Sequence, residues 1–299
     1  MRKITIGSRG SDLALWQANH VKRQLEALGN EVEIQVIVTQ GDAIQNLSFD
    51  KLEGKGFFTK EIEVALLNKS IDLAVHSHKD LETNPPAGLV IAAVSEREDP
   101  SELLLIRKES VEVGNVWNLK LNGILGTSSA RRKSLVKKFR ADLQINDLRG
   151  NVPTRIQKLR DGNYDAILLA KAGVDRLKID LSEFHVEVLA PTQFVPAPAQ
   201  GVLALQIREE DTELAEILQN LNHQDVAARI GIERLILNQM EGGCQLPLGV
   251  YCSEEHKLFV AYAPTSQHAA QHLEYSITDS STIVAKVVND LKQLSVIEA

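Results

Sequence analysis

The sequence predicts an α/β protein in which a second domain is inserted into the first and a small α+β section follows. Three observations support this fold class. Short apolar segments typical of buried strands alternate with amphipathic helical segments up to residue 170. Two polar or proline-rich segments, residues 95–100 and 191–201, interrupt this alternation and indicate two crossings between domains. After about residue 218, a long helical pattern is followed by strands and a closing helix.

The spacing of apolar residues predicts each element in turn. The first domain should contain strands at residues 4–7, 32–39, 73–77 and 89–94, and helices at 12–28, ended by Gly29, and 59–69. The inserted domain should contain strands at 102–106, 124–125, 143–147 and 166–170, and helices at 130–139 and 152–161. The last section should contain helices at 224–240 and 283–294 and strands at 249–252 and 258–262. The predicted domains are residues 1–96 with 197–217, residues 97–196, and residues 218–299.

Composition excludes several classes of protein. The 299 residues are 43% apolar and 24% charged, which excludes a collagen-like or wholly disordered chain. No apolar run approaches the roughly 18–20 residues that cross a bilayer, and a strand-like alternation follows Met1 directly. We therefore expect a cytoplasmic protein without a membrane partner. Cys244 and Cys252 are the only cysteines, which excludes a disulfide scaffold and a four-cysteine zinc site.

Positive charge is concentrated in one part of an acidic chain. The whole chain has a net charge of −7, whereas residues 126–178 carry 13 Lys and Arg against five Asp. This distribution argues against a nucleic-acid partner along the length of the chain and favours a local anion site. A solvated basic face is the plain alternative.

The loop at residues 126–132, between a predicted strand and a predicted helix, is the first candidate anion site. Thr127, Ser128 and Ser129 offer hydroxyl groups, and the helix start offers free N–H groups. Arg131 and Arg132 add the fork geometry that suits a carboxylate or phosphate. Ordinary helix capping by serine is the simpler interpretation of the hydroxyl groups.

Arginine recurs at the following strand ends. Arg149 and Arg155 flank the next strand-to-helix junction, and Arg176 follows the third strand. Ligands of α/β proteins usually bind where strand ends share one edge of a sheet. This recurrence favours a binding edge over a solvated face.

Two further motifs do not support a nucleotide site or a metal site. Residues 54–58, GKGFF, lack the spacing of a phosphate loop, and no G-x-G-x-x-G occurs, so we reject nucleotide binding. His76 with His78, and His268 with His272, have no third ligand nearby, so we expect no metal.

An acidic residue and a cysteine stand out at predicted loops. Asp80 follows a predicted strand and is adjacent to Lys79. It could form a surface ion pair with Lys79, or it could be a carboxylate placed at the strand end to manage positive charge. Cys244 lies in a glycine-flanked turn and could be a nucleophile or an attachment point, whereas Cys252 has the pattern of a buried structural cysteine.

These motifs occur together in one order along the chain: SRGSDLALWQ at residues 8–17, GKGFF at 54–58, VHSHKD at 75–80, GTSSARR at 126–132, LRGN at 148–151, QG at 200–201 and EGGCQLPLG at 241–249. In this order the chain resembles the porphobilinogen deaminase family, also called hydroxymethylbilane synthase. The resemblance implies three domains, the first two like the lobes of a periplasmic binding protein around a cleft. It implies a monomeric transferase that joins four porphobilinogen molecules head to tail into hydroxymethylbilane, releasing four ammonia, in porphyrin and haem biosynthesis.

The resemblance also implies roles for single residues. Asp80 matches the catalytic aspartate, and Cys244 matches the cysteine that holds a dipyrromethane cofactor through a thioether. The other positions matched to cofactor contacts are Ser77, Lys79, Thr127, Ser128, Ser129, Arg131, Arg132, Arg149 and Gln200. The positions matched to substrate contacts are Arg9, Ser11, Lys55, Arg149, Arg155 and Arg176.

The chain departs from the family pattern at a few positions. Gln40 replaces a common arginine, and His78 replaces an apolar residue. Leu81-Glu82 replaces Val-Pro, and Pro198-Ala199 replaces Val-Gly or similar before Gln200. These departures concern the loop after residue 40 and the hinge rather than the reaction.

A function from another class fits the same two-lobed fold. The chain could be a non-catalytic solute-binding protein for a small dicarboxylate. The expected cytoplasmic location and the cysteine loop weigh against this alternative.

Overall fold

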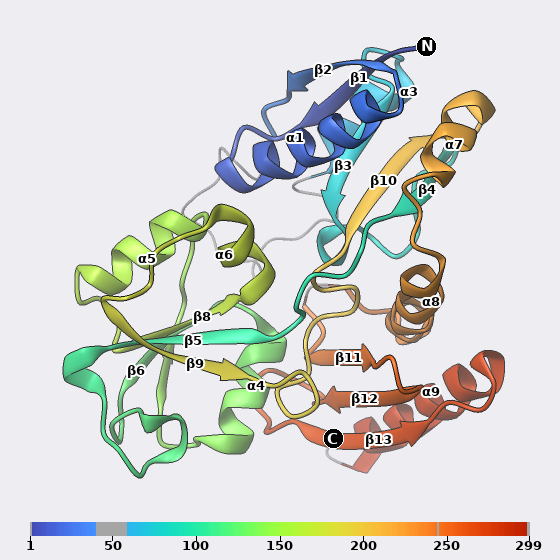
Figure 1. The fold of residues 1–299 in the computed structure, drawn as a ribbon. Coiled ribbons are helices and arrows are strands. Elements are labelled where there is room, and N and C mark those ends of the chain that lie inside the picture. Colours follow the sequence, from blue (N-terminus) through green and yellow to red (C-terminus); the bar gives the residue numbers. More distant parts are fainter. Residues whose placement is uncertain (1, 40–58, 244, 298–299) are drawn as a thin grey trace. The chain divides into compact units, whose positions relative to one another are not determined.

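The computed structural model describes residues 2–39, 59–243 and 245–297 (Figure 1). These residues form two compact units. Unit 1 contains residues 2–39, 59–98 and 200–228, and unit 2 contains the other described residues. The chain passes from unit 1 to unit 2 after Glu98 and returns after Ala199, inside both segments that the sequence marks as crossings. The further division at residue 218 into a third domain stays a prediction.

Unit 1 is a five-stranded mixed sheet with helices on both faces. Its elements are β1 (Lys3–Ser8), α1 (Asp12–Ala27), β2 (Glu31–Val36), α3 (Lys60–Leu67), β3 (Leu73–Ser77), the short 3₁₀ helix η2 (His78–Asp80), β4 (Leu89–Val94), β10 (Leu203–Arg208) and α7 (Thr212–Gln219). The strand order is β2-β1-β3-β10-β4, with β1 parallel to β2 and β3, and β10 antiparallel to β3 and β4.

The faces of this sheet follow the alternation of side chains along each strand. Leu73 and Val75 of β3 pack in one cluster with residues of α1 and α7. Ala74, between them, packs in another cluster with Ile62 and Leu66 of α3. Helices α1 and α7 therefore cover one face, and α3 covers the other.

Unit 2 contains a second five-stranded sheet and a smaller three-stranded one. The first part consists of β5 (Glu102–Arg107), the short helices η3 (Lys108–Ser110) and η4 (Val116–Asn118), β6 (Ile124–Gly126), α4 (Ala130–Phe139), β7 (Gln144–Asn146), α5 (Val152–Arg160), β8 (Ala166–Ala170), α6 (Lys171–Leu177) and β9 (Phe184–Leu189). The sheet order is β7-β6-β8-β5-β9. The second part consists of α8 (Gln224–Gln239, which begins in unit 1), β11 (Leu248–Cys252), β12 (Lys257–Tyr262), β13 (Gln271–Ser276) and α9 (Ser280–Ile297).

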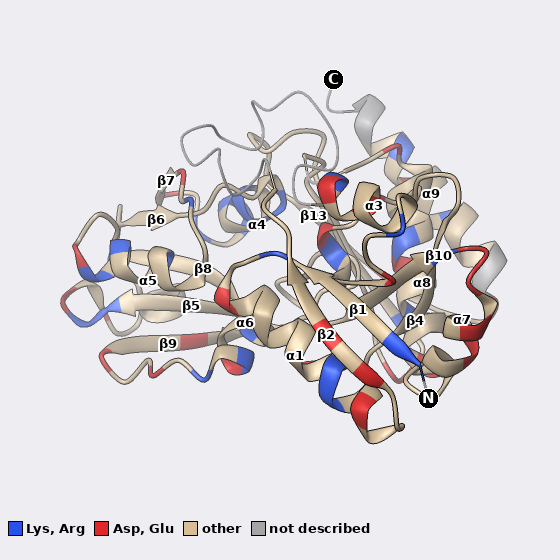
Figure 2. Cartoon of the chain, turned by 90° about the horizontal axis from the view of Figure 1, so that it is seen from above, with Lys and Arg blue, Asp and Glu red and all other residues tan. Residues whose placement is uncertain are grey.

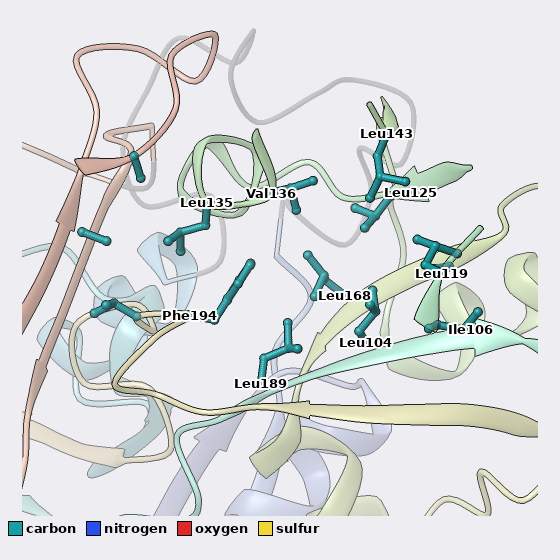
Figure 3. Packing of buried hydrophobic residues seen from close by; sticks show 14 of the residues in the cluster. Leu104, Ile106, Leu119, Leu125, Leu135, Val136, Leu143, Leu168, Leu189 and Phe194 are labelled. Carbon is teal, nitrogen blue, oxygen red and sulfur yellow. The ribbon is translucent and has the colours of Figure 1, made fainter. Parts of the chain in front are cut away.

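One buried cluster links these two parts of unit 2 (Figure 3). Leu135 and Val136 of α4 pack against Leu104 and Leu168 of the large sheet, and Phe259 of β12 belongs to the same cluster. On the opposite face, α5 and α6 cover the sheet through a separate apolar cluster. The shared core explains why both parts form one compact unit.

The structure confirms the predicted fold class of two α/β parts and a small α+β section. Among the α-helices and strands of the described residues, the sequence missed α6, β9, β10, α7 and β13, and it did not predict the short 3₁₀ helices. In strand β10, Leu203, Leu205 and Ile207 alternate with Ala204, Gln206 and Arg208, a strand signal that the sequence offered, although all six residues are buried in the structure. The cleft implied by the family resemblance stays a prediction. Among the described residues, no helix has the length and apolar character that a membrane span requires.

Candidate active site

Two parallel strands bring the first group of predicted residues to one edge of the unit 1 sheet. β1 and β3 are hydrogen-bonded neighbours, so their carboxyl ends lie at the same edge. Arg9 and Ser11 follow β1, and Asp80 follows β3 as the last residue of η2. The short helix fixes the backbone at Asp80, while its side chain stays exposed.

A pocket of about 90 Å³ lies at this edge. Its described lining consists of Arg9, Ser11, Leu13, Ala14, Gln17, Thr59, Ile62, Val75, His76, Ser77 and Asp80. Four of the predicted site residues, Arg9, Ser11, Ser77 and Asp80, are thus brought together in one unit.

Hydrogen bonds order the α1 side of the pocket. Ser11 is the N-cap of α1, and its Oγ accepts from the Ala14 N–H at 3.4 Å. Gln17 Nε2 donates to Ser77 Oγ at 2.9 Å. Both serines are therefore oriented by α1.

Lys79 and Asp80 do not form the ion pair that their adjacency suggests. Lys79 Nζ donates to Gln200 Oε1 at 3.1 Å, and Arg97 Nε donates to the Gln200 carbonyl oxygen at 3.0 Å. Gln200 is fully buried. Within the described part of the chain, Asp80 has no ion pair or hydrogen bond. Its carboxylate therefore remains available to a ligand.

His76 is buried on the wall of the pocket and belongs to a polar chain. Its Nε2 lies 3.0 Å from Gln206 Oε1, and Gln206 Nε2 donates to Glu63 Oε1 at 3.1 Å. Burial lowers the pKa of His76 to about 4, with the Gln206 contact opposing the shift. The imidazole is neutral at physiological pH. In the described ranges, no three His, Cys, Asp or Glu side chains gather as a metal site requires.

The second group of predicted residues lies at strand ends in unit 2. β6 is parallel to β7 and β8, so their carboxyl ends share an edge. Ser128 Oγ donates to the Leu148 carbonyl oxygen and accepts from the Leu148 N–H. Ser129 caps α4, its Oγ accepting from the Arg132 N–H at 3.4 Å, as the simpler interpretation of these hydroxyls predicts. Thr127 is buried beside them.

Arg131 and Arg132 share a carboxylate that the sequence did not single out. Glu102, the first residue of β5, is fully buried. It accepts from Arg131 Nη2 at 2.6 Å, Arg132 Nη2 at 2.6 Å and Arg132 Nε at 3.2 Å. Arg131 Nη1 also donates to the Val195 carbonyl oxygen, and Arg132 Nη1 to that of Leu168. Both guanidinium groups are held rigidly; a charged residue opening an apolar strand was the signal available in the sequence.

Three further predicted arginines follow the strands of this sheet. Arg155 Nε donates to the Gly150 carbonyl oxygen at 2.7 Å, and Arg149 lies beside this turn, half-buried. Arg176 is buried on α6, after β8. Basic residues colour much of α4 in Figure 2, in agreement with the predicted basic segment.

Several predicted positions lie outside the described residues: Gln40, Lys55 with the GKGFF motif at 54–58, and Cys244. Cys252 is described and buried in β11, where its N–H donates to Glu233 Oε1 at 2.8 Å. This placement agrees with a structural role for Cys252.

Comparisons with known proteins give the chain a family. The family model described as "Porphobilinogen deaminase, dipyromethane cofactor binding domain" matches residues 4–216. Proteins named porphobilinogen deaminase are similar to this chain over most of its length. One from Sulfurimonas denitrificans is 45% identical over 85% of this chain and 80% of its own length. One from Maridesulfovibrio salexigens is 46% identical over 85% and 82%, respectively.

A solved periplasmic binding protein from Salmonella typhimurium shares 11% identity at a TM-score of 0.42, over 76% of this chain and 94% of that chain. This level of likeness carries no inference about ligands. The identity to the curated relatives and the match to the family model lead to one conclusion: the chain belongs to the porphobilinogen deaminase family.

Proposed function

We propose that this chain is a transferase that condenses four porphobilinogen molecules head to tail into hydroxymethylbilane, with release of four ammonia. The observation that carries the proposal is the strand-end pocket of unit 1, where an available Asp80 carboxylate lies with Arg9 and Ser11. Family membership supplies the substrate. A cytoplasmic, monomeric enzyme of tetrapyrrole biosynthesis, without a nucleic-acid or membrane partner, is part of this proposal.

The arginines suit the acidity of the substrate and product. Each porphobilinogen brings an acetate and a propionate, so the growing chain gathers many carboxylates. Burying these groups unpaired would be prohibitive, and guanidinium groups offer them charge-assisted, bidentate hydrogen bonds. We assign this role to Arg131, Arg132, Arg149, Arg155 and Arg176 in unit 2 and to Arg9 in unit 1. Lys55 has the same proposed role, although it lies outside the described residues.

Asp80 has the position and freedom that the chemical step needs. When ammonia leaves the aminomethyl group, the electron pair of the C–N bond leaves with nitrogen, and positive charge develops over the pyrrole ring. A fixed carboxylate can accept a hydrogen bond from the pyrrole N–H group and stabilise that charge. Asp80 is anchored by η2 and has no internal partner within the described residues, so it does not have to break a contact first. The same carboxylate can assist proton transfer at the ring.

The residues of unit 2 fit a dipyrromethane with acidic side chains. Of the ten guanidinium N–H groups of Arg131 and Arg132, three are bound by Glu102 and two by carbonyl oxygens. Within the described residues the remaining five have no acceptor and could donate to a ligand, and Glu102 is the one carboxylate that pairs with the two arginines there. When bound, a dipyrromethane supplies a pyrrole carbon to which the first substrate can be joined. Ser77, Lys79, Thr127, Ser128, Ser129, Arg149 and Gln200 complete the proposed contacts with it.

The attachment point can be tested by intact mass. We propose that Cys244, and not Cys252, holds the dipyrromethane through a thioether, because Cys244 lies in the glycine-flanked family motif. The purified protein should exceed its sequence mass by two linked pyrrole units. Cys244→Ser should lose this excess, and the matched Cys252→Ser should keep it. Pyrroles on Cys252 would contradict the assignment.

The activity itself is tested with porphobilinogen. Incubation of the purified, cofactor-loaded protein should release one ammonia per substrate consumed and yield hydroxymethylbilane. Tight binding without ammonia release would instead support the non-catalytic solute-binding protein, the alternative that the fold allows.

A further inference from the structure

The pocket of unit 1 has two chemically different sides. Successive side chains of a strand point to opposite faces, and Ser77 of β3 contacts Gln17 of α1. His76 therefore faces the α3 side, where its neighbour in the alternation, Ala74, packs against α3 residues. Thr59 and Ile62, at the start of α3, complete this side of the lining. Arg9 and Ser11 belong to the α1 side.

Thr59 leaves an unsatisfied polar atom on the α3 side. Its side chain is 2% exposed, and its Oγ1 has no hydrogen-bond partner within the described residues. Although Thr59 is the N-cap residue of α3, it makes no side-chain capping bond. A buried hydroxyl without a partner costs free energy, so its presence in a pocket wall indicates a ligand group.

The polar chain behind His76 fixes which ring nitrogen carries the proton. Glu63 has a carboxylate, which accepts, so Gln206 turns its amide N–H toward Glu63 and its carbonyl oxygen toward His76. His76 Nε2 must then donate to Gln206, and Nδ1 is left with a lone pair. Gln206 is buried, which shields this arrangement from water. The α3 side of the pocket thus contains two acceptor atoms, His76 Nδ1 and Thr59 Oγ1.

We propose that the α3 side of the pocket is a subsite for the aminomethyl nitrogen of the substrate, bound by His76 Nδ1 and Thr59 Oγ1. This inference rests on the proposed function, since it names the group of porphobilinogen that enters this side. A protonated primary amine has three N–H donors and needs acceptors. Asp80, the one carboxylate of the described lining, would lie at the pyrrole ring of the same molecule.

The low basicity of His76 suits a leaving group. Burial lowers the pKa of His76 to about 4, so the imidazole accepts a hydrogen bond from an alkylammonium group without removing its proton. The nitrogen then departs as neutral ammonia, taking the electron pair of the C–N bond. Around His76, the charged lining residues are Arg9 and Asp80, and Glu63 lies behind Gln206; Lys60 and Glu61 of α3 do not belong to the described lining.

Thr59→Val tests the subsite with little risk to folding, because the hydroxyl has no partner to lose within the described residues. The variant should keep the unfolding midpoint of the wild type, while ammonia release in a single turnover of the loaded enzyme falls about tenfold, as for a lost hydrogen bond to a charged group. Thr5→Val, within β1 and outside the described lining of the pocket, makes the same chemical change and should leave ammonia release unchanged.

Gln206→Glu tests the role of His76 through its protonation. A carboxylate facing Nε2 should raise the pKa of His76, so that Nδ1 becomes protonated near neutral pH and ammonia release falls below the new pKa. Nitrogen-15 NMR of labelled protein should show a neutral, Nε2-protonated His76 in the wild type and a raised pKa in the variant.

A wild-type Nδ1-protonated tautomer, or wild-type ammonia release by both variants, would overturn the subsite. Turnover by the wild type in those same assays would show that the proposed function still stands. Absence of turnover in the loaded wild type would instead count against the function itself.

Discussion

Two carboxylates at strand ends of this molecule have opposite surroundings. Glu102 of unit 2 is fully buried and bound by two arginines. Asp80 of unit 1 is exposed at a pocket and has no partner within the described residues. The proposed function uses the same functional group in two ways: Glu102 holds the two arginines assigned to acidic groups, and Asp80 stays available to the cation proposed to form during the reaction. The comparison indicates that the role of a carboxylate depends more on its interaction partners than on whether it precedes or follows a strand.

The comparison predicts its largest effect on stability at Glu102. Glu102→Gln should lower the free energy of unfolding by about 3–5 kcal/mol, because two buried guanidinium groups lose their counter-charge. Urea unfolding measures this change. Glu183→Gln, which removes an exposed pair with Arg160 in the same unit, is the control and should cost less than about 1 kcal/mol. Equal losses in the two variants would show that Glu102 is not the organiser of the arginines.

A second prediction concerns His76, which lines the same pocket as Asp80. The folded protein lowers the pKa of His76 to about 4 from 6.5, so the unfolded chain binds the proton more readily. Stability should be fully present above pH 6.5 and should fall by about 3 kcal/mol as pH drops toward 4. His76→Gln should flatten this part of the stability profile. Replacement of the exposed His256 by Gln should leave the slope as in the wild type; the same slope in His76→Gln would contradict the prediction.

The smallest predicted effect lies where the chain returns from unit 2 to unit 1. Ala199 is buried with φ of +60°, and its N–H donates to Glu233 Oε2 at 2.7 Å. A left-handed alanine is strained by roughly 1–2 kcal/mol, and glycine relieves this strain. Glycine also raises the conformational entropy of the unfolded chain, which offsets part of the gain. Ala199→Gly should therefore stabilise by up to about 1 kcal/mol in thermal or urea unfolding. Ala204→Gly, in the ordinary conformation of β10, should destabilise, and a matching loss in Ala199→Gly would rule out strain at this position.

The sequence predicted those parts of the fold that depend on local pattern. The bounds of α4, Ala130–Phe139, and of β3 and β8 agree with the structure because periodicity and a capping serine mark them. The position of β10 between β3 and β4 could not be predicted, since it arises from pairing across more than 100 residues. The sequence marks Glu102 only as a charged residue that opens an apolar strand, and its partners could not be predicted because they lie on another element.

The candidate site was predicted in the same uneven way. Arg9, Ser11, Ser77 and Asp80 were chosen from the family motifs, and the structure places them around one pocket. Thr59, Gln206 and Glu63 were missed, because an unsatisfied hydroxyl or a polar chain between elements has no local signature. The roles of the chosen residues remain proposals, and Cys244 and Lys55 lie outside the described part of the chain.

The most direct test of the account is ammonia release by cofactor-loaded Asp80→Asn. The asparagine keeps the size of the side chain and removes its charge, so folding and cofactor loading should match the wild type. Single-turnover ammonia release should fall by about two orders of magnitude or more, as expected when one preorganised electrostatic group is removed. Asp12→Asn, an exposed carboxylate in the first turn of α1, is the control and should release ammonia at the wild-type rate. Near-normal release by the loaded Asp80→Asn protein would contradict the assignment of the chemical step to the unit 1 pocket.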